Sequence, residues 1–385
     1  MPTGGILEPV SLTEFFEQYW EQQPLHIARA GTNPFAQCMS IDRIEDLLST
    51  NELKFPTLQV TQSGQSIPVS EYTDIHHNIV SSRVIDRYRD GGTIVLSHAH
   101  KLQTELMQLC RIVQASFMMS CQTNVYLSPA SNQGLKPHFD THDVFILQVS
   151  GRKTFNFYAG GASFPTSADR FNSDVHKVGD KTESIALSAG DTLYIPRGVV
   201  HDAVADNDEP SLHITLGVYP ILMHELLDEV VQGAIASEVA LRRSIPQSLW
   251  TNSDSSSQSI SDINSVIKRH LNEEGVQRAL SRLRDNAALE SIQNSRGLLE
   301  RPPPDILNTK ATLQLDRARI IGFERVDSLL KLRTFGAVIE FEDPFGAAVE
   351  WLLSQDEATP AEIPHLSGHQ RTALLEKLSS VIGIK

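Results

Sequence analysis

His138 and Asp140 lie two positions apart in the segment Pro137-His138-Phe139-Asp140. Side chains at positions i and i+2 of a β-strand point to the same face, so this segment predicts an imidazole and a carboxylate directed into one space. His201 follows about sixty residues later and can bring a second imidazole to that space from a distant strand. A small β-barrel, whose interior holds one small ligand, is a fold that allows this arrangement.

The residues after Asp140 have the pattern of a β-hairpin. A mostly apolar run, 144–149, is followed by a turn at 150–152 and by an alternating run, 153–158. Lys153 shares one face of the second strand with two phenylalanines. Because an unpaired buried charge is costly, Lys153 predicts an anionic partner, which a dicarboxylate co-substrate would supply.

The residues before and after His201 predict further strands. Gly190-Asp191 is expected to form a turn, 192–195 a strand, and Pro196-Arg197-Gly198 a second turn that delivers His201. The alternating run 211–218 predicts the next strand.

Two histidines and one carboxylate on one face, with the other positions open, are the ligand set of non-haem Fe(II) oxygenases. The sequence therefore predicts that His138, Asp140 and His201 bind iron, and that the open positions admit a chelating co-substrate and then O₂. A His-x-Asp segment alone usually has no function. The segment around His201, together with Lys153, favours metal ligation here.

Other polar residues close to these segments have simpler interpretations. His142 is expected at the surface or behind the ligands, and His213 in the core or in a hydrogen bond that orients a ligand. Asn124 could point into the cavity or away from it. Solvent-exposed positions are expected for three charged residues, Asp143, Asp202 and Arg197.

The sequence resembles the cupins, and among them the Jumonji-C branch of the 2-oxoglutarate oxygenases. Gly190, Pro196, Gly198 and His201 are similar to the second cupin motif, although Ala205 stands where an asparagine is expected. The first cupin motif has His-x-Asp in place of the usual His-x-His and Glu. This combination is what points to the Jumonji-C branch.

Within that branch, the sequence is most similar to the ribosomal oxygenase subfamily, which hydroxylates ribosomal proteins. The resemblance covers most of the chain and includes the runs 15–25, 124–130, 133–135 and 147–153. It implies that Lys153 binds the far carboxylate of 2-oxoglutarate, helped by Tyr126 and Thr215. From its own surroundings Tyr126 could equally be an ordinary aromatic residue of a strand.

The strand pattern and the resemblance predict an α+β fold class with a double-stranded β-helix, the jelly-roll barrel of the cupins. Four divisions are expected: an N-terminal segment of helices and strands packed on the barrel (1–121), the barrel (122–220), a helical dimerisation region (221–300) and a winged-helix-like domain (301–385). The segment 160–180 is expected to form a loop over the mouth of the barrel that could touch the substrate.

Local patterns add several expected elements. A helix is expected over 12–20 with Ser11 as its N-cap, and another over 101–117. A helical run is expected over 222–243. Further expectations follow in chain order: a Ser-rich loop at 251–261, a second helical run over 263–299, a stiff break at 301–304, strands at 311–315 and 337–341, and helices at 344–353 and 370–382.

The helices after the barrel are where the resembling family dimerises, which predicts a homodimer. The alternative is a helical layer that covers the barrel of a monomer.

The composition predicts a globular protein with an acidic surface. The chain has 385 residues, 40% of them hydrophobic and 21% charged, with a net charge of -14. Such a surface repels nucleic acid, so a basic protein or peptide substrate is expected, and no direct DNA binding. Three cysteines without a C-x-x-C pair, no signal-peptide pattern at the start and no apolar stretch of transmembrane length predict a cytoplasmic protein away from membranes.

The sequence and the resemblance together predict an enzyme, a dioxygenase that uses Fe(II), 2-oxoglutarate and O₂ to hydroxylate a protein side chain. The resemblance implies that this side chain is an Arg or His of a ribosomal protein. The same chemistry could act on another protein or peptide, by demethylation of lysine or by tailoring of a natural product. A metal-binding cupin that is not an oxygenase is disfavoured, because its ligand set is missing and Lys153 would have no role. A transcription regulator is disfavoured by the charge.

Overall fold

A computed structural model describes residues 5–206, 209–245, 247–250, 256–292, 298, 312–326 and 328–384. The chain forms two compact units, Met1–Pro220 and Ile221–Lys385. Among the residues described, no helix is both long enough and apolar enough to cross a lipid bilayer.

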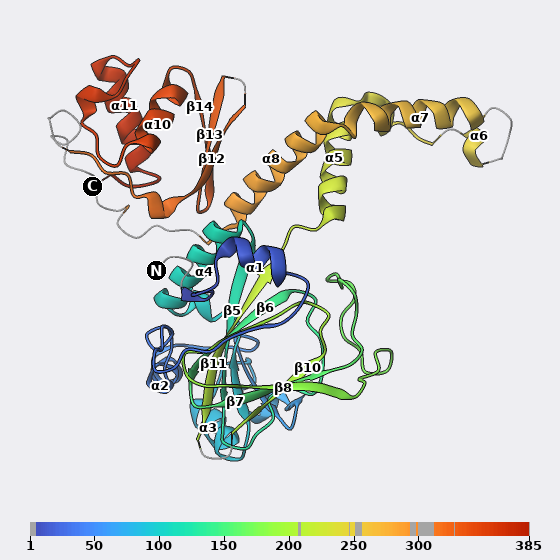
Figure 1. The fold of residues 1–385 in the computed structure, drawn as a ribbon, viewed down its shortest axis with the longest axis vertical. Helices are drawn as coiled ribbons and strands as arrows, with labels where there is room; N and C mark the ends of the chain where they lie inside the picture. Colours follow the sequence, from blue (N-terminus) through green and yellow to red (C-terminus); the bar gives the residue numbers. More distant parts are fainter. Residues whose placement is uncertain are drawn as a thin grey trace. The chain divides into compact units, whose positions relative to one another are not determined.

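The first unit is built on two antiparallel sheets (Figure 1). The larger sheet has the strand order β1-β9-β6-β11-β5-β4-β2-β3, and the smaller has the order β10-β7-β8. The strands are β1 (Leu25–Ile27), β2 (Leu58–Gln62), β3 (Gln65–Ser66), β4 (Thr93–Leu96), β5 (Ser120–Ser128), β6 (Asp143–Ser150), β7 (Lys153–Tyr158), β8 (Lys181–Leu187), β9 (Thr192–Ile195), β10 (His201–Ala205) and β11 (Ser211–Tyr219).

The two sheets pack face to face around an apolar core. Phe155 and Phe157 of β7 contact Val144 and Ile146 of β6 across that core. Along β7 every second side chain is buried, as the alternating sequence predicts. The α+β class and the jelly-roll barrel are therefore confirmed.

Four helices belong to the same unit: α1 (Leu12–Gln18), α2 (Ile41–Thr50), α3 (Ser81–Arg89) and α4 (Thr104–Phe117), with short 3-10 turns at Val69–Glu71 and Ala99–Lys101. The expected N-cap is confirmed, because the Ser11 hydroxyl accepts a hydrogen bond from the Glu14 amide at 3.1 Å. Helix α3 and strand β8 are among the elements of this unit that were not expected from the sequence. The first residues of β8 are exposed on both faces and give no alternation.

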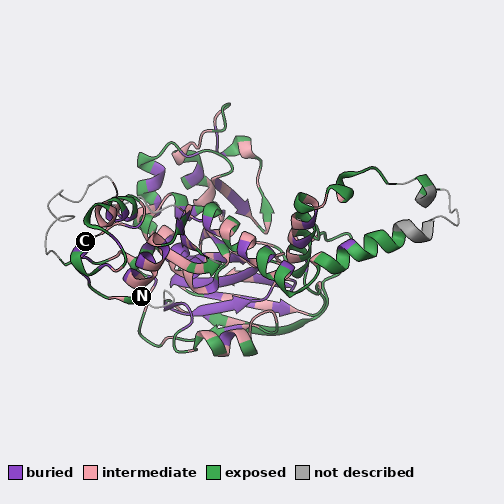
Figure 2. Cartoon of the chain, turned by 90° about the horizontal axis from the view of Figure 1, so that it is seen from above, coloured by how far each residue is buried: buried purple, intermediate pink, exposed green. Residues whose placement is uncertain are grey.

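The second unit begins with α5 (Met223–Ser237), a 3-10 turn (Val239–Arg242), α6 (Gln247–Trp250), α7 (Ser256–His270) and α8 (Glu273–Glu290). Most of the described side chains of α7 are exposed, as Figure 2 shows. The helical run expected over 263–299 consists of two helices as far as residue 290, the end of α7 and all of α8. The Asn272 side chain accepts a hydrogen bond from the Gly275 amide at 2.8 Å, which caps and starts a new helix at that point.

The prediction of a Ser-rich loop over 251–261 is partly wrong, because 256–261 lie in α7. Residues 251–255 lie outside the described residues. The helical run over 222–243 is interrupted after Ser237.

The unit ends in a three-stranded antiparallel sheet followed by two helices. These elements are β12 (Ile320–Val326), β13 (Leu329–Thr334), β14 (Ala337–Glu342), α10 (Phe345–Ser354) and α11 (Gly368–Ser379), with 3-10 turns at Arg317–Arg319 and Pro360–Glu362. The strand expected at 311–315 is wrong: only isolated bridges form there, Leu313 with Ala358 and Leu315 with Ile384.

The expected break at 301–304 lies outside the described residues, and the winged-helix-like character of this domain stays a prediction.

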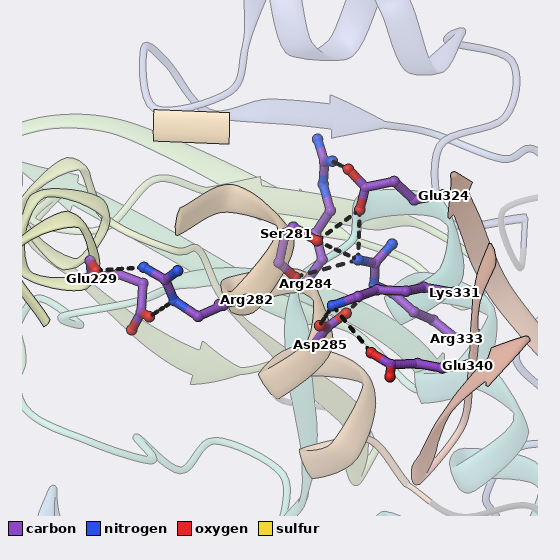
Figure 3. A network of polar contacts seen from close by, with 9 residues as sticks. All are labelled: Glu229, Ser281, Arg282, Arg284, Asp285, Glu324, Lys331, Arg333 and Glu340. Carbon is purple, nitrogen blue, oxygen red and sulfur yellow. Dashed lines mark hydrogen bonds and ion pairs between the residues drawn. The ribbon is translucent and has the colours of Figure 1, made fainter. Parts of the chain in front are cut away.

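A network of charged side chains joins α8 to β12 and β13 (Figure 3). The carboxylate of Asp285 accepts hydrogen bonds from Lys331 Nζ and from Arg333 Nε, both at 2.7 Å. Arg333 is only 2% exposed and also donates to Glu324 at 2.6 Å. A buried guanidinium group is costly unless carboxylates accept its hydrogen bonds. The contact of α8 with β12 and β13 therefore depends most on Asp285.

We expect Asp285→Ala to destabilise this unit by about 3 kcal/mol, since it leaves the buried Arg333 and Lys331 without their shared carboxylate. Amides of β12 and β13 should then exchange with deuterium about 100-fold faster. Glu340→Ala is the matched control: its carboxylate lies 3.6 Å from Lys331 and its side chain is 54% exposed, so little change is expected. Equal exchange in both variants would contradict the role of Asp285.

Candidate metal centre

His138 and His201 come together through their backbones. The two residues form an isolated antiparallel bridge, in which the His138 amide donates to the His201 carbonyl at 3.0 Å and the His201 amide donates back at 2.8 Å. Their rings lie 4.8 Å apart. The expectation that His138 and Asp140 lie on a β-strand is wrong, because the chain between β5 and β6 makes only isolated bridges.

Asp140 is held beside the two histidines by the turn that precedes His201. Its carbonyl accepts a hydrogen bond from the Gly198 amide at 2.9 Å. Its carboxylate lies 3.8 Å from His201 Nε2, and the potential ligand atoms of His138, Asp140 and His201 all lie within 4.8 Å of one another. The structure thus brings together the three residues that the sequence singled out.

The two imidazoles have the hydrogen bonds that suit metal ligands. Nδ1 of His138 lies 2.8 Å from the Lys136 carbonyl, and Nδ1 of His201 lies 3.0 Å from the Val199 carbonyl. A carbonyl can only accept, so Nδ1 carries the proton and Nε2 keeps a free lone pair. Burial, followed by the neighbouring His138, lowers the pKa of His201 and favours its neutral form. The donor set fits a divalent metal such as Fe(II).

Lys153 lies in the same cavity as this cluster and is only 1% exposed. Its ammonium donates a hydrogen bond to the Ser128 hydroxyl at 3.0 Å, and no ion pair to Lys153 occurs among the described residues. Burial lowers the pKa of Lys153 to about 7. A buried ammonium without a counter-ion is what a site for an anionic ligand requires before the ligand binds.

Tyr126 and Thr215 line this cavity as well, on the adjacent strands β5 and β11. The Tyr126 ring stacks on the His213 ring at 4.9 Å, and burial raises the pKa of the Tyr126 hydroxyl to about 12, so it stays a hydrogen-bond donor. Asn124 lines the cavity too, and its side-chain oxygen accepts from the His98 amide.

His142 and His213 also line this cavity. His142 stacks on Tyr219 at 4.5 Å and lies outside the three-residue cluster. His213 is buried, and its Nδ1 has no partner among the described residues. Burial, followed by the nearby Lys153, lowers the pKa of His213 well below its usual value, so the ring is neutral.

Three expectations of solvent exposure are wrong. Asp143 is fully buried and accepts a hydrogen bond from the Tyr194 hydroxyl at 2.6 Å; burial raises its pKa to about 6. Arg197 is buried against Glu21, with which it forms an ion pair. Asp202 is buried and accepts from three side chains, those of Gln133, Asn156 and Tyr158. A sequence shows these charges but not their partners, which come from distant segments.

Ser128 is a residue that the sequence analysis did not assign. It is fully buried, and its hydroxyl receives hydrogen bonds from both Lys153 and Thr93. Its only signal in the sequence is its place in the run 124–130, which also contains Tyr126.

Comparison with known proteins places this site in a family. Residues 95–226 match the model of the JmjC domain. A relative from Drosophila mojavensis, named bifunctional lysine-specific demethylase and histidyl-hydroxylase NO66, is 34% identical over 64% of this chain and 28% of its own length. The protein of the same name from Dictyostelium discoideum is 31% identical over 56% of this chain and 42% of its own length. The chain therefore spans less than half of these curated relatives.

Among solved structures, the Escherichia coli ribosomal oxygenase YcfD in complex with cobalt and 2-oxoglutarate has a similar fold. The match has a TM-score of 0.55 and covers 98% of both chains at 15% sequence identity. The bridge between the two histidines and the buried lysine lie in the region that matches the JmjC domain, residues 95–226. The chain thus contains a region similar to the JmjC domain, within a fold similar to that of a ribosomal oxygenase.

Proposed function

We propose that this chain is an Fe(II)- and 2-oxoglutarate-dependent dioxygenase that hydroxylates an Arg or His side chain of a ribosomal protein. The observation that carries the proposal is the shared cavity, in which a buried and unpaired Lys153 lies with a cluster of two histidines and one carboxylate. A metal site alone would not need this lysine. A dicarboxylate that chelates the metal at one end needs a cation at the other.

Each residue has one task in this proposal. Nε2 of His138, Nε2 of His201 and the carboxylate of Asp140 hold the metal. Lys153 binds the far carboxylate of 2-oxoglutarate, and Tyr126 and Thr215 donate hydrogen bonds to it. Iron supplies the activation of O₂, with one oxygen atom going to the substrate C–H bond and the other to succinate as CO₂ is lost.

The names of the similar proteins support both the chemistry and the class of substrate. One is a histidyl-hydroxylase, and another is a ribosomal oxygenase solved with cobalt and 2-oxoglutarate. Ribosomal proteins are basic, and the net charge of -14 favours such a partner. The name of the relatives also includes lysine demethylation, so that reaction is the alternative, and its products would be formaldehyde and a lysine with one methyl group fewer.

We also propose that two copies of the chain associate through the helices after the barrel. Large apolar side chains are exposed on α5 and α7: Met223, Leu227, Val231, Ile260, Ile263 and Ile267. A second copy would cover them, and sedimentation of the purified chain as a monomer would exclude this association.

All three cysteines are free thiols, which agrees with the proposed cytoplasmic location.

Intact-mass spectrometry of ribosomal proteins tests the function directly. Cells that lack this gene should contain one ribosomal protein that is lighter by a single oxygen atom than in wild-type cells. Expression of the intact chain should restore the mass, and expression of Asp140→Ala should not. If every mass is the same in both strains, the ribosomal substrate is excluded, and the search passes to other basic proteins and to methylated lysines.

The affinity for 2-oxoglutarate should fall as the pH rises above about 7. Burial lowers the pKa of Lys153 to about 7 in the free protein, and only the protonated form attracts a carboxylate. The Kd should therefore be constant below that pH and increase about tenfold per pH unit above it, because binding must then take up a proton. Anaerobic calorimetry at several pH values, with Co²⁺ in the site, measures this. A Kd that does not change with pH would contradict the role of Lys153.

A further inference from the structure

The loop between β7 and β8 has two inward-facing rings in a segment that is otherwise exposed. From residue 167 to residue 180, every side chain is exposed except Phe171 and His176. These two rings stack on each other at 5.6 Å. The loop is closed at its base by backbone hydrogen bonds, from the Ala159 amide to the Asp180 carbonyl and from the Gly179 amide back to the Ala159 carbonyl.

Both rings pack on Phe139, the residue between the proposed ligands His138 and Asp140. Phe139 is only 2% exposed. Its ring meets the Phe171 ring edge-on at 5.3 Å and the His176 ring at 4.9 Å. Aromatic pairs in this geometry attract each other beyond the effect of the area that they bury.

The position of the His176 ring is set by the turn in which it lies. Its Nδ1 accepts a hydrogen bond from the Asn172 amide at 3.0 Å, and its own amide donates to the Asn172 carbonyl at 2.7 Å. The Asn172 side chain in turn accepts from the Asp174 amide at 2.9 Å. The turn therefore presents a fixed imidazole to Phe139 rather than a freely rotating one.

The first part of the same loop contacts the other segment that carries a ligand. The Ala162 amide donates to the Gly198 carbonyl at 3.2 Å, and the Gly198 amide donates to the Asp140 carbonyl. Gly198 has a φ of +84°, and a Cβ there would lie 1.9 Å from the Ala162 oxygen, so only glycine allows this approach. One loop thus touches the chain on both sides of the metal cluster.

The segment that carries His138 and Asp140 needs such support. It lies outside any regular strand, and its backbone is tied to the rest of the barrel by the bridge to His201 and the bond from Gly198. Packing around Phe139 is therefore the contact that limits rotation of this segment about those few hydrogen bonds.

We propose that Phe171 and His176 are positioning residues of the metal centre. Through Phe139 they hold His138 and Asp140 at the separation that a metal requires. This inference rests on the proposed function only in so far as that function needs a metal at these residues. It makes the loop part of the support of the metal site.

Binding of Co²⁺ to the metal-free protein, followed by visible absorption, tests the inference without any turnover. Phe171→Ala and His176→Ala should each weaken Co²⁺ binding about tenfold and alter the ligand-field spectrum, because support behind metal ligands is worth about 10- to 100-fold in affinity. His176→Phe keeps a ring against Phe139 and should restore most of the affinity. Val175→Ala is the matched control, because Val175 lies in the same turn and is 70% exposed.

The possible outcomes separate this inference from the proposed function. If the wild-type chain does not bind Co²⁺, the metal site and the proposed function fail together. If wild type binds Co²⁺ and His176→Ala binds it equally well with the same spectrum, the inference is overturned and the function stands. His176 is only partly buried in a loop, so His176→Ala is expected to fold even if Phe171→Ala does not.

Discussion

Lys153→Ala should abolish measurable binding of 2-oxoglutarate while Co²⁺ still binds with wild-type affinity. Apart from the histidines, Lys153 is the only cationic residue among the described residues that line the cavity. Its ammonium group has no carboxylate partner there. A charge-assisted hydrogen bond in a buried site contributes about 3 kcal/mol, which corresponds to a loss of at least about 100-fold in affinity. Anaerobic calorimetry with the Co²⁺-loaded protein measures both constants.

A change in stability separates this role from a purely structural one. Burial holds the pKa of Lys153 near 7, against a usual value of 10.5. Because the unfolded chain binds this proton more tightly, the buried lysine costs the folded state about 4 kcal/mol at neutral pH, and the cost falls as the pH rises from about 7 to about 10.5.

Lys153→Met should therefore melt at a higher temperature than wild type at neutral pH, with a gap that closes as the pH rises toward 10.5, while 2-oxoglutarate binding is lost. A stabilised variant that binds no co-substrate would identify Lys153 as a functional group kept at the expense of stability. A Lys153→Met variant that melts lower than wild type and still binds 2-oxoglutarate would contradict this account.

The barrel could be predicted because its strands have strong local patterns. The alternation of β7, the turns at Gly151 and Gly198, and the apolar run of β6 each follow from short-range preferences. The helical region was harder, because its breaks depend on single capping residues. Asn272 ends one helical pattern and begins another without any change in hydrophobic periodicity.

The metal ligands and Lys153 could be predicted from the sequence, but the residues that support them could not. His138, Asp140, His201 and Lys153 have chemically distinctive types at distinctive spacings. The buried states of Asp143 and Asp202 depend on Tyr194, Tyr158 and other partners that lie far away in the sequence, and no local pattern reports them. The contact of Phe171 with Phe139 is of the same kind, since more than one strand and part of a long loop lie between the two residues in the sequence.

Asp140→Ala should remove both metal binding and turnover. Without the carboxylate, His138 and His201 offer a divalent metal two neutral donors at a site that otherwise has three ligands. Loss of the one anionic ligand should weaken Co²⁺ binding by at least about 100-fold, well beyond the effect expected for residues that only support the ligands.

His142→Phe is the matched control for Asp140→Ala. His142 lines the same cavity but stacks on Tyr219 outside the three-residue cluster, and phenylalanine keeps that stacking. Co²⁺ binding should remain at the wild-type level in this variant. If His142→Phe loses the metal and Asp140→Ala keeps it, the ligand set would have to be His138, His142 and His201, a three-histidine site of a different chemical class. The comparison of these two variants therefore tests the identity of the carboxylate ligand, on which the proposed oxygenase chemistry depends.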